Sequence, residues 1–329
     1  MVKYILKRLF TSIFILFGVS LILYFLVRLM PLDGLMNAAQ IKLDDPNAME
    51  RWNNFLVYYG LDDNSFGGIL KGYFSWLGRF IQGDFGESLA DGSKVADAIF
   101  RDMGTSFVIS FISLVLQLII AVPLGIKCAC NQYGKLDYAV TVLTMIGISF
   151  PSFFFGNILI RIFAVELGWF PAGGLIDITQ GHTGFAAFLD MAWHLVLPLF
   201  VLVILGIGSL MRYTRTNTLE VLNADYIRTA RAKGLSENKV VYKHVFRNTM
   251  IPLVTTLAGI LPGLFGGSMI TEQVFGLPGV GYAAWKAFTD VNIAFVMTYN
   301  MFIAVLTVIG ILLTDLMYAV VDPRVKLGK

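Results

Sequence analysis

The amino-acid sequence predicts an all-α integral membrane protein with six transmembrane helices and both chain ends in the cytoplasm. The first observation is the composition: hydrophobic residues make up 57% of the chain and charged residues 14%, whereas charged residues make up about a quarter of a soluble globular domain. The second is that the apolar residues lie in six long stretches. The third is that Lys and Arg gather in alternate connections between these stretches. The formal net charge of +3 is too small to indicate nucleic acid as a partner.

Each apolar stretch is long enough for a membrane-crossing helix, because a rise of about 1.5 Å per residue requires about 20 residues for the hydrocarbon core. We expect the first span within residues 1–30, after Lys3, Lys7 and Arg8. It is too long for the apolar core of a secretory signal peptide, and no small-residue cleavage site follows it, so we expect a retained anchor. The other five spans are expected at residues 106–126, 138–165, 191–211, 249–271 and 291–320.

Positive charge sets the orientation of the spans. The short segments before the first span, between the second and third, between the fourth and fifth, and after the sixth carry 3, 2, 8 and 3 Lys or Arg. The connections after the third and fifth spans carry none and one. Because basic residues are enriched on the cytoplasmic side of membrane proteins, we expect both chain ends and the connection of residues 212–248 inside the cell. Residues 106–329 are then one membrane core.

Residues 31–105 form the longest segment between spans and are expected to fold as an extracytoplasmic subdomain. The segment holds eleven acidic and six basic residues, which agrees with an outside location. Asp45 and Pro46 are typical of a helix start, and Gly60 is typical of a helix end. A second apolar face runs over residues 69–81. We expect both faces to pack within the subdomain, to cap the bundle or to lie on the lipid surface; direct contact with a substrate is the alternative.

The sequence lacks the patterns that membrane enzymes and ATPases need. It contains no HExxH, no GxSxG, no pair of intramembrane aspartates and no GxxxxGK[ST] phosphate loop. We therefore predict no enzyme and no bound cofactor or metal, and we interpret Cys128 and Cys130 as reduced thiols. His194 has no carboxylate neighbour in its predicted span, which favours a structural role, and Asp315 is expected to pair with another helix. The scarcity of charge at membrane depth argues against an ion-coupled transporter or channel, which is the alternative from another functional class.

The third and fifth predicted spans are rich in small and polar residues. Such residues allow helices to pack closely, and prolines allow them to bend. Close packing explains much of this pattern and a polar path across the membrane explains the rest; the two interpretations are compatible. The residues predicted to line that path are Ser149, Asn157, Thr255, Thr256, Gly259, Gly263 and Ser268.

The connection of residues 212–248 contains a short predicted helix. Asp225 can cap its start, residues 226–233 favour helix, and Gly234 can end it in the left-handed conformation. Ser236 can cap a second helix that leads into the fifth span. The two helices and the glycine turn would form a compact knob on the cytoplasmic face. The alternative is a solvated basic loop held by anionic lipid headgroups.

This connection resembles the EAA loop of ABC importer permeases, in the form found in their oligopeptide and dipeptide branch (the OppB and DppB type). The alignment places Arg228, Thr229 and Ala230 at the Glu-Ala-Ala positions and Gly234 at the glycine of the motif, so the signature glutamate is absent. Four other stretches match the branch in order, and the resemblance covers nearly the whole chain. These stretches are residues 83–88 (GDFGES), 169–174 (WFPAGG), 272–281 (EQVFGLPGVG) and 322–324 (DPR).

The resemblance implies a type I ABC importer permease fold and a subunit of a complex in a bacterial plasma membrane. The implied partners are a second, homologous permease subunit, two cytoplasmic ATPases that bind ATP and Mg²⁺, an extracytoplasmic substrate-binding protein and membrane lipid. The implied substrate is an oligopeptide or dipeptide; nickel, an oligosaccharide or glutathione is the alternative within the branch. The residues implied to couple to an ATPase are Asp225, Tyr226, Arg228, Thr229, Ala230, Arg231, Ala232, Lys233 and Gly234.

Overall fold

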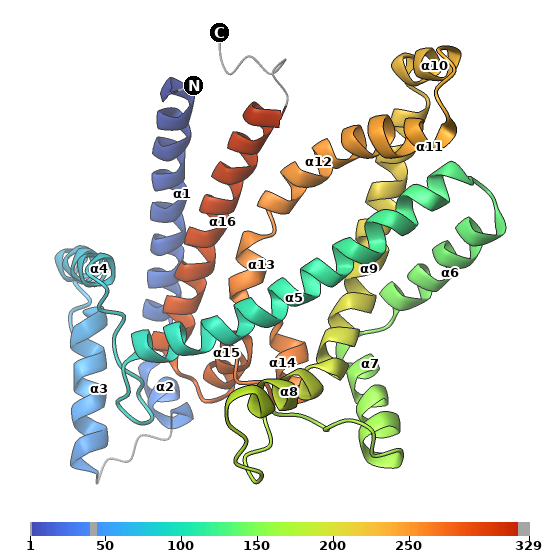
Figure 1. Ribbon diagram of the computed structural model, residues 1–329. Helices are drawn as coiled ribbons and strands as arrows, with labels where there is room; N and C mark the ends of the chain where they lie inside the picture. The colour runs from blue at the N-terminus through green and yellow to red at the C-terminus, as the bar shows by residue number, and fades with distance from the viewer. Residues whose placement is uncertain (1, 40–44, 322–329) are drawn as a thin grey trace.

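The computed structural model describes residues 2–39 and 45–321 of the 329-residue chain, so the stretch of residues 322–324 lies outside the described part. Within that part the chain is helical, with one pair of bridged extended residues, Glu87 and Lys94. The elements are α1 (Val2–Arg28), α2 (Leu32–Ala38), α3 (Pro46–Tyr59), α4 (Phe66–Ile81), α5 (Val95–Cys130), α6 (Lys135–Ser149), α7 (Ser152–Leu159), the π-helix η1 (Ile160–Glu166), α8 (Gly184–His194), α9 (Val196–Leu222), α10 (Asp225–Ala232), α11 (Glu237–Lys239), the π-helix η2 (Val240–Val245), α12 (Phe246–Ala258), α13 (Leu261–Gly266), α14 (Met269–Phe275), α15 (Val280–Thr289) and α16 (Ile293–Val321). Figure 1 shows the start of α1, the end of α16 and α10 at the same end of the molecule, in agreement with the predicted orientation.

Four helices of the described chain are long and apolar enough to cross a membrane, namely α1, α5, α9 and α16. The third and fifth predicted spans are broken instead. The two parts of the third meet at 99° between α6 and α7, and those of the fifth meet at 53° between α12 and α13. The described chain has six spans if each bent pair crosses the membrane once.

Proline and glycine account for both breaks. Pro151 separates α6 from α7, and Phe150 is extended because a residue that precedes proline avoids the helical region. In the fifth span the helix is interrupted at Gly259, just ahead of Pro262 in the first turn of α13. Gly267, with φ at +72°, follows the end of α13. Each break therefore lies next to a proline, whereas Pro252 lies inside the continuous helix α12.

The second span is longer than the sequence predicted. Because α5 starts at Val95, the expected boundary at residue 105 falls inside this helix. The first turns of α5 carry Asp97, Arg101 and Asp102, and the last two form an ion pair of 2.7 Å. Hydropathy alone could not detect these turns, since they are polar and lie beyond the apolar stretch.

The subdomain packs as a pair of helices beside α1 (Figure 1). Asp45 caps the start of α3 and Gly60 ends it in the left-handed conformation, as predicted. A Cβ atom on Gly60 would lie only 2.7 Å from the Cα atom of Gly72 in α4, so the two helices can approach because both residues are glycine. Tyr24 of α1 donates a hydrogen bond of 2.8 Å to the backbone oxygen of Tyr59.

Two ion pairs join helices toward the end of the molecule that carries α10. Arg8 of α1 lies 3.0 Å from Asp315 of α16, which confirms the predicted helix-to-helix role of that carboxylate. Arg215 of α9 donates two hydrogen bonds of 2.7 Å to the carboxylate of Asp137 at the start of α6. Both hydrogen bonds are charge-assisted and share one planar geometry, so this pair fixes the orientation of α6 on α9.

Candidate functional site

Residues 225–234, which we call the coupling segment, project beyond the ends of α9 and α12 (Figure 1). Two buried side chains of its helix α10, Ile227 and Ala230, anchor it. They pack in one apolar cluster with Val240 and Val245 of η2. Residues three apart lie on the same face of a helix, so the rest of α10 faces away from the protein.

The remaining residues of the predicted coupling set form an exposed surface. Tyr226 is 49% exposed, although it is the largest apolar side chain of the segment. Arg231 is tied back to α11, because its guanidinium lies 2.6 Å from the carboxylate of Glu237. The exposed members are Asp225, Tyr226, Arg228, Thr229, Arg231, Ala232, Lys233 and Gly234.

The predicted capping of this segment is only partly right. The residue before α10 is Ala224, and Asp225 is the first helical residue, where its charge favours the positive helix end without closing a capping bond. Its carboxylate lies 3.6 Å from Arg228 in an exposed pair. Ser236 does precede α11, but its side chain makes no capping bond. Gly234 ends the helix at a φ of +76°, as predicted.

Among the predicted path residues, Gly263 and Ser268 come together at one cavity. This cavity, of about 230 Å³, lies between α5, α9 and the α13–α14 turn. Its other polar lining residues are Ser110, Ser113 and Gln117 of α5. The Gln117 amide donates to the Ser113 hydroxyl (2.9 Å) and to the backbone oxygen of Leu202 (3.2 Å) in α9. The lining is therefore uncharged but rich in hydrogen-bonding groups.

The other predicted path residues do not reach this cavity. Ser149 and Asn157 are exposed on α6 and α7, and each side chain donates to a backbone oxygen of its own helix turn or the preceding one. Thr255 is buried at 1% exposure and packs inside the bundle. Thr256 is exposed on α12, and Gly259 is exposed at the break of the fifth span.

Sequence reasoning missed the three polar residues of α5. Ser110, Ser113 and Gln117 lie three and four residues apart, which is the spacing of one helix face. That periodicity was available in the sequence as a polar stripe within an otherwise apolar span. A search for single charges at membrane depth does not find it, because none of the three side chains is ionisable.

A buried carboxylate organises the turn after the fifth span. Glu272 is 2% exposed. One oxygen accepts hydrogen bonds from the Ser106 hydroxyl (2.8 Å) and the Ser268 backbone N–H (3.1 Å), and the other accepts one from the Tyr282 backbone N–H (2.9 Å). Ser106 also accepts from the backbone N–H of Val280 (2.8 Å). The carboxylate thus ties α14 to both α5 and α15.

The glycines of the 272–281 stretch make room for that carboxylate. A Cβ atom on Gly279 would lie 2.4 Å from a carboxylate oxygen of Glu272, and one on Gly281 would lie 2.9 Å from it. The 169–174 stretch lies against the same turn, since the backbone N–H of Gly174 donates to the oxygen of Phe275 (2.8 Å). Two of the matching stretches are therefore parts of one structure.

The prediction that His194 has no carboxylate neighbour is wrong. Its Nδ1 atom lies 3.2 Å from Asp190, one turn earlier in α8, and His182 lies 4.0 Å from the same carboxylate. Asp190 also accepts a hydrogen bond of 2.7 Å from the backbone N–H of Asp177. The sequence reading missed Asp190 because it precedes the apolar stretch by one residue, whereas α8 runs through that boundary. In the described chain no group of three or more His, Cys, Asp or Glu residues is arranged to hold a metal ion.

Comparison with known proteins covers almost the entire chain. Residues 121–327 match the model of a family described as "Binding-protein-dependent transport system inner membrane component". The "Oligopeptide transport system permease protein AppB" of Bacillus subtilis (strain 168) is 38% identical over 99% of this chain and 100% of its own length. The "Dipeptide transport system permease protein DppB" of the same strain is 35% identical over 84% of each chain.

A solved structure has the same fold. It is described as "Inward facing conformations of the MetNI methionine ABC transporter", with a TM-score of 0.51 and 18% identity. The match covers 68% of this chain and 96% of that chain. At this identity the likeness establishes the architecture and nothing about the substrate.

Proposed function

The chain belongs to the family of binding-protein-dependent transport system inner membrane components, and on that premise we propose that it is the permease subunit of an ATP-driven importer of oligopeptides or dipeptides. It works in the plasma membrane of a bacterium and performs no covalent chemistry. A second permease subunit completes the pore, two ATPases supply the energy, and an extracytoplasmic binding protein delivers the peptide.

The coupling segment is the observation that carries this proposal. A short helix, held by Ile227 and Ala230, presents an exposed face beyond the membrane helices. Because it is continuous with α9 and leads through η2 into α12, a displacement of the segment moves both helices. An ATPase that changes shape when it binds nucleotide can move the pore subunit only through a rigid contact of this kind.

The cavity beside Gly263 and Ser268 supports a peptide as the cargo. Its polar lining offers hydroxyl and amide groups and no charge, and these groups match the N–H and C=O groups that every peptide backbone carries. A path that hydrogen-bonds the backbone and leaves side chains alone suits cargo of variable sequence. The names of the relatives favour the same substrate class.

Uptake by the reconstituted complex tests the proposal. The chain is assembled in proteoliposomes with its second permease subunit, both ATPases and its binding protein, and uptake of labelled di- to pentapeptides is followed with ATP and without it. ATP-dependent accumulation of peptide is expected. Peptide flux that persists with ATPases unable to hydrolyse ATP would contradict the coupling, and uptake of nickel or an oligosaccharide in place of peptide would contradict the substrate class.

A further inference from the structure

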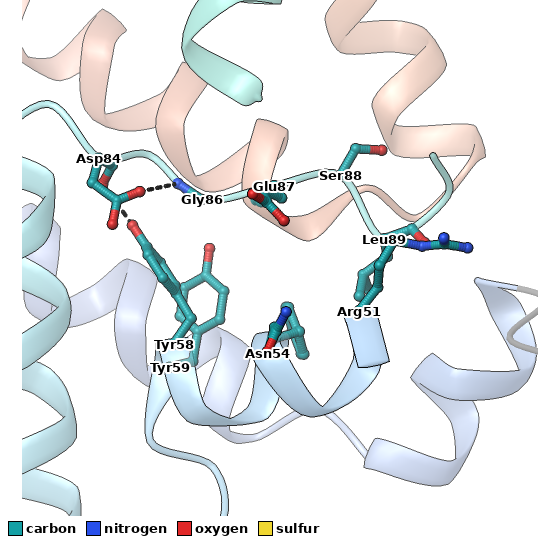
Figure 2. Close-up of a pocket in the computed structure, with 11 residues that line it drawn as sticks. Arg51, Asn54, Tyr58, Tyr59, Asp84, Gly86, Glu87, Ser88 and Leu89 are labelled. Carbon is teal, nitrogen blue, oxygen red and sulfur yellow. Dashed lines mark hydrogen bonds between the residues drawn. The ribbon is translucent and has the colours of Figure 1, made fainter. Parts of the chain in front are cut away.

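A second cavity lies between α3 of the subdomain, the 83–89 loop and the first turn of α16, where Ala294 lines it (Figure 2). Its volume is about 230 Å³, which is smaller than the roughly 300–1,000 Å³ of ordinary ligand pockets. The rings of Phe55, Tyr58 and Tyr59 form one wall. Asp84 and Glu87 of the loop face them. A cavity of this volume fits the end of a peptide chain rather than a folded segment.

Tyr59 is the unusual residue of this cavity. The residue is 1% exposed, and Figure 2 shows its hydroxyl pointing toward the 83–89 loop. Its neighbour Tyr58 donates a hydrogen bond of 2.7 Å to the backbone oxygen of Asp84. The Tyr59 side chain lines the cavity, and no hydrogen bond joins its hydroxyl to another described residue, so this hydroxyl is available to a molecule that enters the cavity. Burial holds the pKa of the Tyr59 phenol well above its usual value, so the hydroxyl keeps its proton and remains a donor.

The charges around the cavity favour a cation. Asp84 uses one carboxylate oxygen to accept from the backbone N–H of Gly86 (3.1 Å). Glu87 is exposed, and no hydrogen bond joins its carboxylate to another described residue, so the carboxylate is free to bind a cation at the cavity. The only cation in the described lining, Arg51, donates through Nε to the backbone oxygen of Leu89 (3.1 Å) at one edge. The Arg79 guanidinium already lies over the Tyr58 ring, 5.3 Å from its centroid, so this wall accepts a cation. The two carboxylates offer an ammonium group charge-assisted hydrogen bonds.

We propose that this cavity binds the free amino terminus of a peptide before the peptide enters the membrane path. The ammonium group lies between the carboxylates of Asp84 and Glu87, and the Tyr59 hydroxyl donates to the first peptide carbonyl. The inference rests on the proposed function, because it assumes that peptides reach this face of the subunit. Such a site would make the transporter select peptides with a free amino terminus, a selectivity that an uncharged membrane path cannot provide.

Calorimetric binding to the full chain in lipid nanodiscs tests the site with two probes, tri-alanine and N-acetyl-tri-alanine. Acetylation removes the positive charge, so we expect it to weaken binding about tenfold or more. Glu87→Gln should weaken tri-alanine binding about tenfold and abolish the preference for it. Tyr59→Phe removes a hydroxyl that has no partner within the described fold, so it should weaken both probes without changing the thermal unfolding temperature.

The matched control is Glu50→Gln. Glu50 is an exposed carboxylate on α3, the helix that carries Tyr59, and it does not line the cavity. It should bind both probes as the wild type does. Equal affinity of the wild type for the two probes, or no saturable binding of either, would overturn the site, as would an equal loss in Glu50→Gln.

Uptake by the complete transporter separates this inference from the proposed function. If the wild-type complex imports tri-alanine with ATP while the nanodisc assay shows no preference for the free amino end, the function stands and the site is wrong. If the nanodisc assay shows that preference while the complex imports no peptide, the site stands and the importer assignment is wrong.

Discussion

Replacing Gly234 by valine should uncouple ATP hydrolysis from uptake while leaving the fold intact. Gly234 has a φ of +76°, and a Cβ atom built on it meets nothing within 4 Å. The cost of the substitution is therefore conformational and not steric. A β-branched residue in the left-handed region costs roughly 1–2 kcal/mol, which depletes the conformation that ends α10 correctly by a factor of about 5–30.

The assay is the ratio of peptide imported to ATP hydrolysed by the reconstituted complex. On the proposed function the ATPases bind the coupling segment, so we expect this ratio to fall about tenfold in Gly234→Val, in which the end of the segment is misplaced. Gly234→Asn should retain most of the ratio, since asparagine tolerates the left-handed conformation. Gly181→Val is the matched control: Gly181 has a φ of +58° with open space around it, in the connection between η1 and α8.

Two results would refute this reasoning. A wild-type ratio in Gly234→Val would show that the shape of the coupling segment does not matter. An equal loss in Gly181→Val would show that backbone strain anywhere in the chain lowers transport, without a special role for this position.

Three further substitutions test the connections that hold the site. Glu272→Gln places an amide NH₂ group next to three hydrogen-bond donors that now point at the carboxylate. This should lower the free energy of unfolding by about 1–3 kcal/mol and lower the thermal unfolding temperature. An unchanged temperature would contradict the buried network. Asp137→Asn leaves the Arg215 guanidinium without its carboxylate at a cost of about 3 kcal/mol, measurable as faster proteolysis at the α5–α6 connection, whereas Arg215→Lys should show an intermediate effect. Gln117→Ala should slow peptide uptake without changing the affinity of the binding protein for peptide; normal uptake would remove the α5 cavity from the path.

Apolar runs and glycine signals carried most of the prediction from sequence. The six apolar stretches correspond to four continuous helices and two bent ones, and the ends of α3 and α10 were found because glycine alone adopts their left-handed conformation readily. The limits of α5 and the neighbour of His194 were missed for one reason. Both involve charged residues, Asp102 and Asp190, that lie just outside an apolar stretch. The carboxylate of Asp190 also accepts a hydrogen bond from the backbone N–H of Asp177, a contact that hydropathy does not represent.

The candidate path was the least predictable part, because its residues meet only through a bend. Composition singled out the fifth span, and two of its predicted residues line the α5 cavity. Composition could not tell which side of the break faces that cavity. Thr255 and Gly263 are both small residues of the same apolar stretch. Thr255 is buried in the bundle, whereas Gly263 lines the cavity. The polar residues of α5 and the small residues of α13 form one cavity only because the two helices pack together, and the sequence does not contain that contact.

The position of the break in the fifth span has a mechanical consequence. Its first half, α12, follows the coupling segment by way of α11 and η2. Its second half, α13, is followed by α14, in which Glu272 accepts a hydrogen bond from Ser106 of α5. When α10 moves, α12 moves with it, whereas α14 beyond α13 is held to α5 by the hydrogen bond of Glu272. Between these two anchors, the helix is interrupted at Gly259, where no bulky side chain resists rotation of the backbone. On the proposed function, we infer that the bend angle of 53° changes there when the ATPases close. Because Gly263 lies one turn beyond the break, the same rotation changes the width of the cavity that Gly263 lines.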